Sequence, residues 1–267
     1  MTGADDPRLA LYRGVSDTAL LRTHDLFVAE GRLVVRRVLR DPRYRVVSVL
    51  VNDAACQGLG DAVPPDVPLI VSDAEGFRRI TGHDFHRGCL ALVRRPPPLS
   101  VEDVLDADED RNGPATVVVL EDVTDADNVG GVFRNAAAFG ARGVILSPGC
   151  CDPLYRKAVR TSMAAVLQVP FARADGWPGA LESMRDRGFL LVALTPRPRS
   201  VALEEFCGRR QLRRIALMVG TEGAGLAPGA ESLADERVSI PMSDAVDSLN
   251  LSVAVGIALH ALRGPAR

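Results

Sequence analysis

The chain of 267 residues contains almost no lysine: Lys157 is the only one, and the other 31 basic residues are arginine. GC-rich coding explains most of this bias, although arginine also suits bidentate phosphate contacts better than lysine does. The formal net charge of −2 provides no overall basic character. This is only weak evidence against a nucleic-acid partner, because a local basic patch can supply the attraction.

Long apolar runs are also missing. None approaches the roughly 20 residues that cross a bilayer, so we expect no membrane-spanning helix. The N-terminal stretch MTGADDPRLALYRG carries an acidic pair, Asp5 and Asp6, and lacks the apolar segment of a signal peptide. CxxC pairs are absent, which favours reduced thiols and a cytoplasmic protein. His83, His86 and Cys89 are evenly spaced, but no fourth ligand stands nearby, so we expect no metal site.

The segment between Arg94 and Pro114 divides the chain. Three consecutive prolines are followed there by six acidic residues, a composition typical of a linker or an exposed, weakly structured segment. We therefore expect a first domain at 1–95, a linker at 96–113 and a second domain at 114–267.

The first domain mixes helix and strand. Residues 24–41, HDLFVAEGRLVVRRVLRD, have apolar side chains at helical spacing, and 45–52, 68–71 and 88–95 are runs typical of strands. These features predict a small α/β module. Its arginines indicate either a solvated helix face or a surface for RNA phosphates. They include Arg22, Arg32, Arg36, Arg37, Arg40, Arg43 and Arg45.

The second domain alternates strands with helices, which predicts a parallel sheet with helices on both faces. Ligands of such sheets bind beyond the carboxyl ends of the strands. The expected strands are 116–123, 143–147, 189–195, 213–220 and 236–242, and the expected helices are 128–140, 152–168, 179–188 and a last one from near Ser248.

Three of these strands are followed by polar or glycine-rich stretches. The first stretch, DADNVGGVFR, lacks the GxGxxG signature of a dinucleotide site. Asn128 and Arg134 are six residues apart and cannot share one helix face, so we expect Asn128 at the helix cap and Arg134 in the second turn. The third stretch ends in SLNLS, whose Ser248, Asn250 and Ser252 open an otherwise apolar helix. Buried polar groups need partners, so these residues either cap the helix or line a site.

The ordered stretches DNVGGVFR, VGTEGAGL and IPMSDAVDSLNLSVA closely resemble the three signature motifs of the SpoU (TrmH) RNA ribose 2′-O-methyltransferases. Each motif alone is modest, but the three in this order are highly specific. FVAEGRLVV and FHRGCLALV resemble, less sharply, the substrate-binding domain often fused ahead of the catalytic domain. The resemblance implies an α/β fold with a mostly parallel sheet and a C-terminal trefoil knot, which pattern reasoning could not predict.

The resemblance implies S-adenosylmethionine as the cofactor. It would bind among the loops of the knot, where Ile240, Met242 and Leu249 can frame an apolar slot for adenine. Gly220 and the strand end at Thr195 are the other cofactor-binding residues that we expect.

The implied reaction is attack of a ribose 2′-hydroxyl on the methyl group of the sulfonium. Arg134 matches the family's essential arginine and would act either as the base or as a group that fixes the adjacent phosphate and polarises the hydroxyl. Arginine is a poor base, because its guanidinium stays protonated in proteins. Asn128 would orient Arg134 or the substrate, and Glu222 would position Asn128 or its own loop. Ser248 and Asn250 would hold the last loop near the reacting groups.

The segment YRKAVRTSMAA resembles one that faces RNA in the family, although many relatives have glycine where Ala164 stands. We expect RNA contacts from Arg22 and Arg36 in the first domain and from Arg156, Lys157, Arg160 and Ser162. The last helix is apolar nearly all round. This implies a homodimer through the C-terminal domain, as in the family, or a helix fully buried within one chain.

The resemblance implies an RNA substrate and no membrane partner. By family analogy, the two-domain layout favours 23S ribosomal RNA over transfer RNA. A resistance methylase that protects its own host has the same layout. One alternative is a non-catalytic RNA-binding protein of this fold, against which the intact Arg134, Glu222 and Asn250 argue. Another is a methyltransferase for a small molecule or a protein, against which the arginine-bearing first domain argues.

Overall fold

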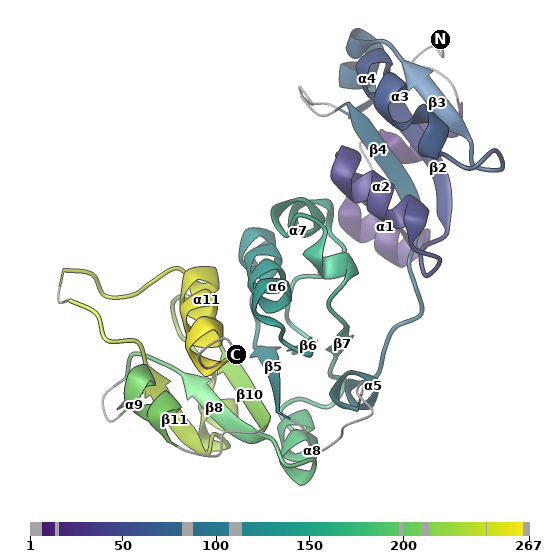
Figure 1. Ribbon diagram of the computed structural model, residues 1–267. Coiled ribbons are helices and arrows are strands. Elements are labelled where there is room, and N and C mark those ends of the chain that lie inside the picture. The colour runs from purple at the N-terminus through teal and green to yellow at the C-terminus, as the bar shows by residue number, and fades with distance from the viewer. Residues whose placement is uncertain are drawn as a thin grey trace. The chain divides into compact units, whose positions relative to one another are not determined.

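The computed structural model describes residues 7–13, 16–81, 88–106, 114–197, 200–209, 214–243 and 245–263. The chain forms two compact units (Figure 1). Unit 1 consists of residues 1–97 and 153–167, and unit 2 consists of residues 98–152 and 168–267. The structure thus places the segment 153–167, which we expected within the second domain, in the same unit as the N-terminal module.

Unit 1 contains a four-stranded mixed sheet. Its strand order is β1 (Leu26–Glu30), β4 (Cys89–Arg94), β2 (Val46–Asn52) and β3 (Leu69–Ser72). Strand β4 runs antiparallel to both of its neighbours, and β2 and β3 are parallel. The helices are α1 (Asp17–Thr23), α2 (Arg32–Arg40), α3 (Asp53–Leu59) and α4 (Ala74–Thr81), with a 3-10 helix at Pro7–Tyr12 and another at Gly60–Ala62. Leu9, Leu50 and Leu90 belong to its core.

The helix predicted at 24–41 is wrong in its first half. Residues Leu26–Glu30 form β1, are buried at every position, and pair with β4. Gly31 then adopts φ 93°, a conformation that favours glycine, and the helix α2 starts at Arg32. A continuous apolar run such as LFVA is compatible with both a buried strand and a helix, so the spacing of apolar residues does not distinguish the two.

The segment 153–167 is helical over a shorter length than the predicted 152–168. It contains α7 (Arg156–Thr161) and a 3-10 helix at Ala165–Leu167. Between them, Met163 and Ala164 have φ values of 52° and 67°. These values lie in the left-handed region, where L-residues are disfavoured and glycine is not. This conformation explains why glycine suits the position of Ala164.

Replacing Ala164 by glycine should therefore cost less stability than the same change in α7. Ala158 and Ala164 are both fully buried, so Ala158→Gly and Ala164→Gly remove the same methyl group and loosen the unfolded chain equally. The difference in stability between the two variants therefore measures the effect of the backbone conformation at each position. We expect Ala164→Gly to be the more stable variant by about 1–2 kcal/mol in urea unfolding. Equal stability of the two variants would contradict the left-handed conformation at Ala164.

Unit 2 contains a seven-stranded sheet in which every pair of neighbours is parallel. The predicted α/β class with a mostly parallel sheet is confirmed. The strand order is β7 (Phe171–Arg173), β6 (Gly143–Leu146), β5 (Ala115–Leu120), β10 (Arg214–Val219), β8 (Leu190–Leu194), β11 (Glu236–Ser239) and β9 (Val201–Ala202). Strands β7 and β9 were not predicted, because they have only three and two residues.

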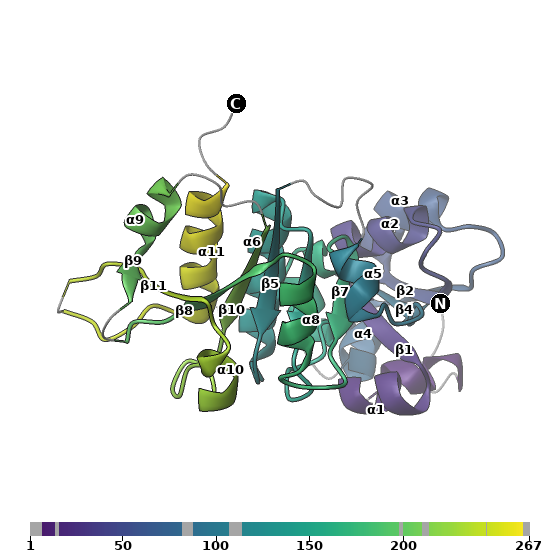
Figure 2. The same cartoon turned by 90° about the horizontal axis from the view of Figure 1, so that it is seen from below.

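Helices cover both faces of this sheet (Figure 2). One face packs against α5 (Val101–Leu105), α8 (Ala180–Asp186) and α10 (Pro228–Ser232), with Val117, Val119 and Met218 in the shared core. The other face carries α6 (Ala126–Phe139) and α11 (Leu251–Leu262), which pack against each other, and α9 (Leu203–Gly208) contacts α11. No described helix is long and apolar enough to cross a membrane.

Part of the expected linker 96–113 is folded. Ser100 and Asp103 form a reciprocal capping box, in which each side chain accepts a hydrogen bond from the backbone of the other at 3.0 and 2.9 Å. The cap starts α5, whose Val101, Val104 and Leu105 are buried in the core of unit 2. The acidic composition suggested an unfolded linker, but its first part forms a short amphipathic helix. Residues 107–113 lie outside the described residues.

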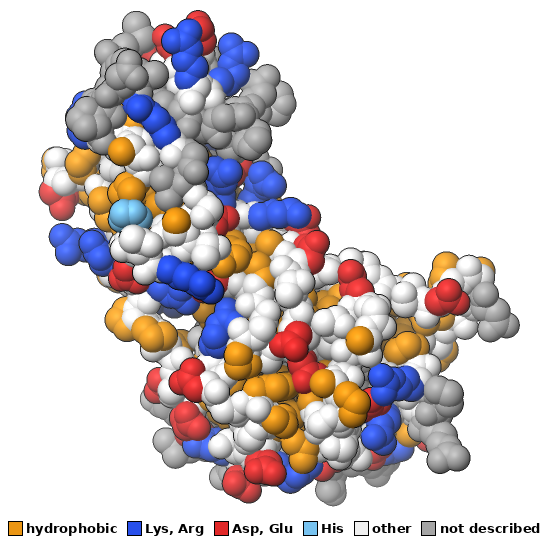
Figure 3. Space-filling model, turned by 180° about the vertical axis from the view of Figure 1, so that it is seen from behind, with side chains coloured by type: hydrophobic (Ala, Val, Ile, Leu, Met, Phe, Trp, Pro, Cys, Tyr) orange, Lys and Arg blue, Asp and Glu red, His pale blue; other side chains and the backbone are white. Residues whose placement is uncertain are grey.

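The two units differ in charge. Unit 1 contains 17 arginine and lysine residues against 12 acidic ones, whereas unit 2 contains 15 against 22. The net charge of −2 is therefore the sum of +5 on unit 1 and −7 on unit 2. Lys and Arg side chains are spread over the visible face of unit 1 in Figure 3. A local attraction for phosphate is thus available despite the acidic total.

Three of the five cysteines are buried: Cys89, Cys150 and Cys151. Burial raises the pKa of Cys89 and of Cys151 to about 12 and also raises the pKa of Cys150. Because the thiolate is the reactive form, Ellman's reagent at pH 8 should titrate at most two thiols, Cys56 and Cys207, in the native protein. All five should react in urea; reaction of three or more in the native state would contradict this packing.

The expectation of no metal site is tested only in part. His83 and His86 lie outside the described residues, and Cys89 is buried in β4. Among the described residues, no group of three or more His, Cys, Asp and Glu side chains could hold a metal ion.

Candidate active site

A pocket of about 290 Å³ opens at the carboxyl ends of β8, β10 and β11, beside the start of α11. Its volume is close to the lower end of the roughly 300–1,000 Å³ that small-molecule sites occupy. The lining residues are Leu194, Thr195, Pro196, Arg197, Val219, Gly220, Thr221, Glu222, Gly223, Ala224, Gly225, Ile240, Met242, Ser248, Leu249, Leu251 and Ala254. All five residues expected to bind a cofactor are among them.

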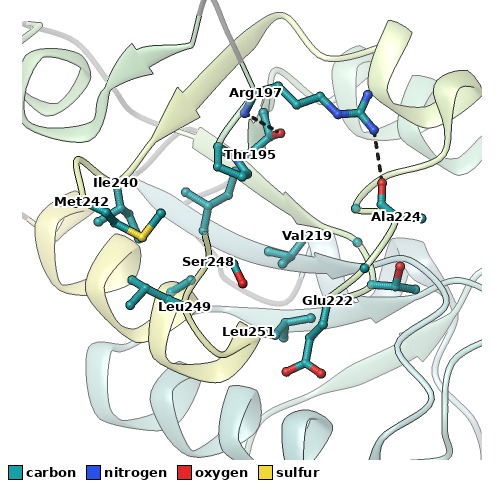
Figure 4. A pocket seen from close by; sticks show the side chains of 17 residues that line it. Thr195, Arg197, Val219, Glu222, Ala224, Ile240, Met242, Ser248, Leu249 and Leu251 are labelled. Atoms are coloured by element: carbon teal, nitrogen blue, oxygen red, sulfur yellow. Dashed lines mark hydrogen bonds between the residues drawn. The ribbon is translucent and has the colours of Figure 1, made fainter. Parts of the chain in front are cut away.

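The pocket combines an apolar slot with accessible backbone. Figure 4 shows Ile240, Met242 and Leu249 on one side, each contributing an apolar side chain. Thr195 enters from the end of β8, where its backbone N–H donates to the carbonyl of Val238 at 2.9 Å. An apolar slot bounded by backbone groups is what a heterocyclic base needs.

The glycine-rich loop forms a closed wall of this pocket. Thr221 and Gly225 exchange two backbone hydrogen bonds of 3.1 and 3.0 Å. A methyl group added at Gly220 would collide with the backbone of Gly225 and Leu226, and Gly225 has φ 73°. Both positions therefore require glycine, one because of close backbone approach and the other because of its conformation. The glycines serve loop closure.

Asn250 joins the three sequence motifs. Its Nδ2 donates to Asn128 Oδ1 at 2.8 Å and to Glu222 Oε1 at 3.0 Å. Its Oδ1 accepts from the backbone N–H and the hydroxyl of Ser252 at 3.0 and 2.7 Å. Asn250 is also the N-cap of α11, which begins at Leu251 rather than near Ser248. One amide thus both caps the helix and orders the site, and Ser252 completes the cap.

The helices α6 and α11 approach each other closely. A methyl group at Gly131 would lie 2.6 Å from Cβ of Ser252, and one at Gly256 would lie 3.0 Å from Nδ2 of Asn135. Asn135 Nδ2 also donates to the carbonyl of Ser252 at 2.6 Å. These contacts bring the first and third motifs together, although they are more than 100 residues apart in the sequence.

Asn128 and Arg134 lie elsewhere on their helix than we predicted. The N-cap of α6 is Asp125, whose side chain accepts from the N–H groups of Asp127 and Asn128 at 2.6 and 3.3 Å. Asn128 lies in the first turn and is only 6% exposed, so the predicted cap position is wrong. Arg134 lies in the third turn and is exposed. Both residues are helical, so they point to different faces, and Asn128 instead contacts Asn250.

Residues 115–260 match the SpoU rRNA Methylase family model. The chain belongs to this family. It is an RNA methyltransferase, and its cofactor is S-adenosylmethionine. An uncharacterized tRNA/rRNA methyltransferase of Mycobacterium bovis is 40% identical over 263 residues, which cover 96% of this chain and 88% of that protein.

Solved structures support the SpoU fold. An AdoMet-bound rRNA methyltransferase from Sinorhizobium meliloti aligns over 98% of this chain and 96% of its own, with a TM-score of 0.82 and 24% identity. A crystal structure described as an RNA 2′-O ribose methyltransferase aligns over 98% of this chain and 97% of its own, with a TM-score of 0.76 and 25% identity. The fold thus extends over both units, and the trefoil knot stays a prediction.

Two residues at this pocket or beside it were not found by sequence reasoning. Arg197 lines the pocket two residues beyond Thr195. Glu121, at the end of β5, is 3% exposed; its carboxylate accepts from Trp177 Nε1 and from the backbone N–H of Ala227, both at 2.7 Å. Glu121 thereby anchors the chain just after the glycine loop. An acidic residue that follows a continuous apolar strand is the signal that could have identified it.

The segment that we expected to face RNA contains α7, which packs against β1 within unit 1. Arg156 Nε and Arg160 Nη1 lie 3.7 and 3.6 Å from the carboxylate of Glu30, which is 3% exposed. The carboxylate of Asp17 accepts from the N–H of Arg156 at 3.0 Å, and burial raises the pKa of Asp17. Lys157 is exposed. Glu30, a buried acid, thus lies beside the guanidinium groups of two arginines whose side chains are 30% and 43% exposed.

The other expected RNA contacts differ in their surroundings. Arg22 is exposed in the last turn of α1. Arg36 is also exposed, and its guanidinium donates to the carbonyl of Gly58. Ser162 is 1% exposed, and its hydroxyl donates to the carbonyl of Val159 at 3.0 Å. The burial of Ser162 does not fit the RNA contact that we expected, because its hydroxyl serves the turn after α7.

Proposed function

We propose that the protein transfers a methyl group from S-adenosylmethionine to a ribose 2′-hydroxyl of structured RNA, most of all 23S ribosomal RNA. The observation that carries this proposal is the Asn250 network, which joins Asn128, Glu222 and the cofactor pocket at one edge of the sheet. The likeness to a structure described as an RNA 2′-O ribose methyltransferase supports the position of methylation. Transfer RNA is the second candidate, because the mycobacterial relative is named for both substrates.

The pocket fits the cofactor by its chemistry. Ile240, Met242 and Leu249 would hold the adenine, and the backbone at Gly220 and Thr195 would supply its polar contacts. When bound, S-adenosylmethionine supplies a methyl group activated by a sulfonium. The chain itself has to exclude water from that group and hold the ribose hydroxyl in line with it.

Arg134 would bind the phosphate next to the target ribose and polarise the hydroxyl. It is exposed on α6, and it makes no ion pair with any residue that the structure describes. A guanidinium that stays protonated at neutral pH suits this role better than that of a base. Ser248, which is exposed and lines the pocket, would approach the same hydroxyl.

Unit 1 would supply the RNA-binding surface. It carries the positive net charge, and Arg156, Lys157 and Arg160 belong to it. Neutralising phosphates releases counterions, so RNA binding through this unit should weaken steeply with salt. The cytoplasm is the expected location.

A homodimer through α11 belongs to the proposal. Within unit 2, the helix buries Leu251, Val255 and Leu259, so part of it is a core helix. Val253 and Ile257, four residues apart, remain 49% and 40% exposed. Their spacing puts them on one face of the helix, where a second copy would cover them.

The test of substrate class is methyl transfer from labelled S-adenosylmethionine to separate pools of unmodified ribosomal and transfer RNA. Label in the ribosomal pool alone would support the proposal, and label in the transfer RNA pool alone would favour the second candidate. Cofactor binding without label in either pool would overturn both and would point to a non-RNA substrate or an assembly intermediate.

A further inference from the structure

Arg197 connects two walls of the cofactor pocket. Its guanidinium Nη2 donates to the carbonyl of Ala224 in the glycine loop at 3.1 Å, as Figure 4 shows. Its backbone N–H donates to Oγ1 of Thr195, at the end of β8, at 3.3 Å. The other guanidinium nitrogen, Nη1, forms an ion pair with Glu231 of α10. One residue therefore fixes the glycine loop to the neighbouring strand end.

Glu231 explains why the arginine is held in place. Its side chain is only 8% exposed, whereas that of Arg197 is 48% exposed. A buried carboxylate needs a charged partner, and Arg237 supplies only a long second contact of 3.4 Å to it. The acid thus fixes the guanidinium in the orientation that reaches Ala224.

We propose that Arg197 is a positioning residue for cofactor binding, which acts by tying the glycine loop to the segment after β8 through Glu231. The loop's inner hydrogen bonds, between Thr221 and Gly225, close the turn but leave Glu222, Gly223 and Ala224 exposed. The bond from Arg197 to the carbonyl of Ala224 holds the backbone of this exposed part from outside, whereas Asn250 holds only the side chain of Glu222. The inference rests on the proposed function only in taking the pocket as the S-adenosylmethionine site.

The test compares two ligands by calorimetry. 5′-Methylthioadenosine keeps the adenosine of S-adenosylmethionine but lacks its amino-acid end. A loosened glycine loop should weaken the binding of any ligand in the pocket. Arg197→Met should therefore raise the Kd of both ligands by about 10-fold, which is the effect of losing one charge-assisted hydrogen bond. In turnover, the loss should lie in the KM for the cofactor more than in kcat. Arg197→Lys keeps the charge but not the planar pair of donors, so its Kd values should lie between those of the parent and those of Arg197→Met.

Arg185 offers a matched control. It donates to the carbonyl of Leu233 and pairs with Asp235 at 3.1 Å, so it has the same kinds of partner, but it does not line the pocket. Arg185→Met should leave both Kd values within about twofold of the parent. Glu231→Gln should weaken binding as Arg197→Met does, and the double variant should be no worse than either single one.

Hydrogen exchange of the cofactor-free protein separates this inference from the proposed function. Arg197→Met should accelerate exchange at Thr221 and Gly225, whatever the RNA substrate is. Unchanged exchange and unchanged Kd values would overturn the inference while leaving the function intact. A loss of S-adenosylmethionine affinity with unchanged 5′-methylthioadenosine affinity would also overturn it, because Arg197 would then be a direct ligand of the amino-acid end.

Discussion

Arg134→Ala should lower kcat/KM for RNA methylation by about 10³-fold while leaving the Kd for S-adenosylmethionine within about twofold of the parent value. Arg134 is exposed on α6 and is not part of the pocket lining, so the cofactor site should stay intact. The lost interaction is the one with the RNA phosphate and the reacting hydroxyl. Arg134→Lys should keep part of the activity, because the positive charge remains although the bidentate fork is lost.

The control for this prediction is Arg209→Ala. Arg209 is also an exposed arginine of unit 2, paired with Glu236 at 2.6 Å, and it is not one of the residues that line the pocket. Its removal should change neither binding nor turnover measurably, as is usual for surface ion pairs. If Arg134→Ala kept activity within tenfold of the parent, Arg134 would have no essential role in the reaction.

Asn250→Asp should disable the site while preserving the helix cap. An aspartate oxygen can still accept from the N–H groups of Ser252 and Val253, so α11 should keep its N-terminus. The amide donors to Asn128 and Glu222 disappear, and a second carboxylate comes to lie beside that of Glu222. We expect methyl transfer to fall by about 10²-fold or more. Asn250→Ala should lose comparable activity and, in addition, about 1 kcal/mol of stability through the lost cap.

A second change tests whether the network itself is responsible. Adding Glu222→Gln to Asn250→Asp restores a donor–acceptor pair in the reverse direction, and the amide of Asn128 can turn to donate as well. We expect this double variant to regain at least about 10-fold of the lost activity. A double variant that is no better than Asn250→Asp would mean that the carboxylate of Glu222 has a role of its own, independent of Asn250.

The positions of the cofactor-pocket residues could be predicted because they depend on strand ends. Thr195, Gly220 and Ile240 each follow an apolar run, and parallel strands bring such residues to one edge. Gly220 and Gly225 could be recognised in the sequence because the close approach and the positive φ that require them arise within their own loop. Family resemblance added the roles, which strand patterns alone do not contain.

The contacts across the site could not be predicted. The pairing of Arg197 with Glu231 joins residues 34 positions apart, and that of Asn250 with Asn128 joins residues 122 apart. Both contacts depend on how the side chains are oriented, and the spacing of residues in the sequence contains no information about that orientation. The wrong cap at α6 has a local cause: Asp125 and Asn128 are both good caps, and the rotation argument assumed that only one of Asn128 and Arg134 is helical.

The central claim, ribose 2′-O-methylation of RNA, is tested most directly by the chemical position of the transferred methyl group. RNA labelled by the protein and S-adenosylmethionine would be digested with alkali, which needs a free 2′-hydroxyl to cleave the chain. The account predicts that the label survives in alkali-resistant dinucleotides and is absent from the Arg134→Ala reaction. Label recovered in single nucleotides would place the methyl group on a base and would contradict the account.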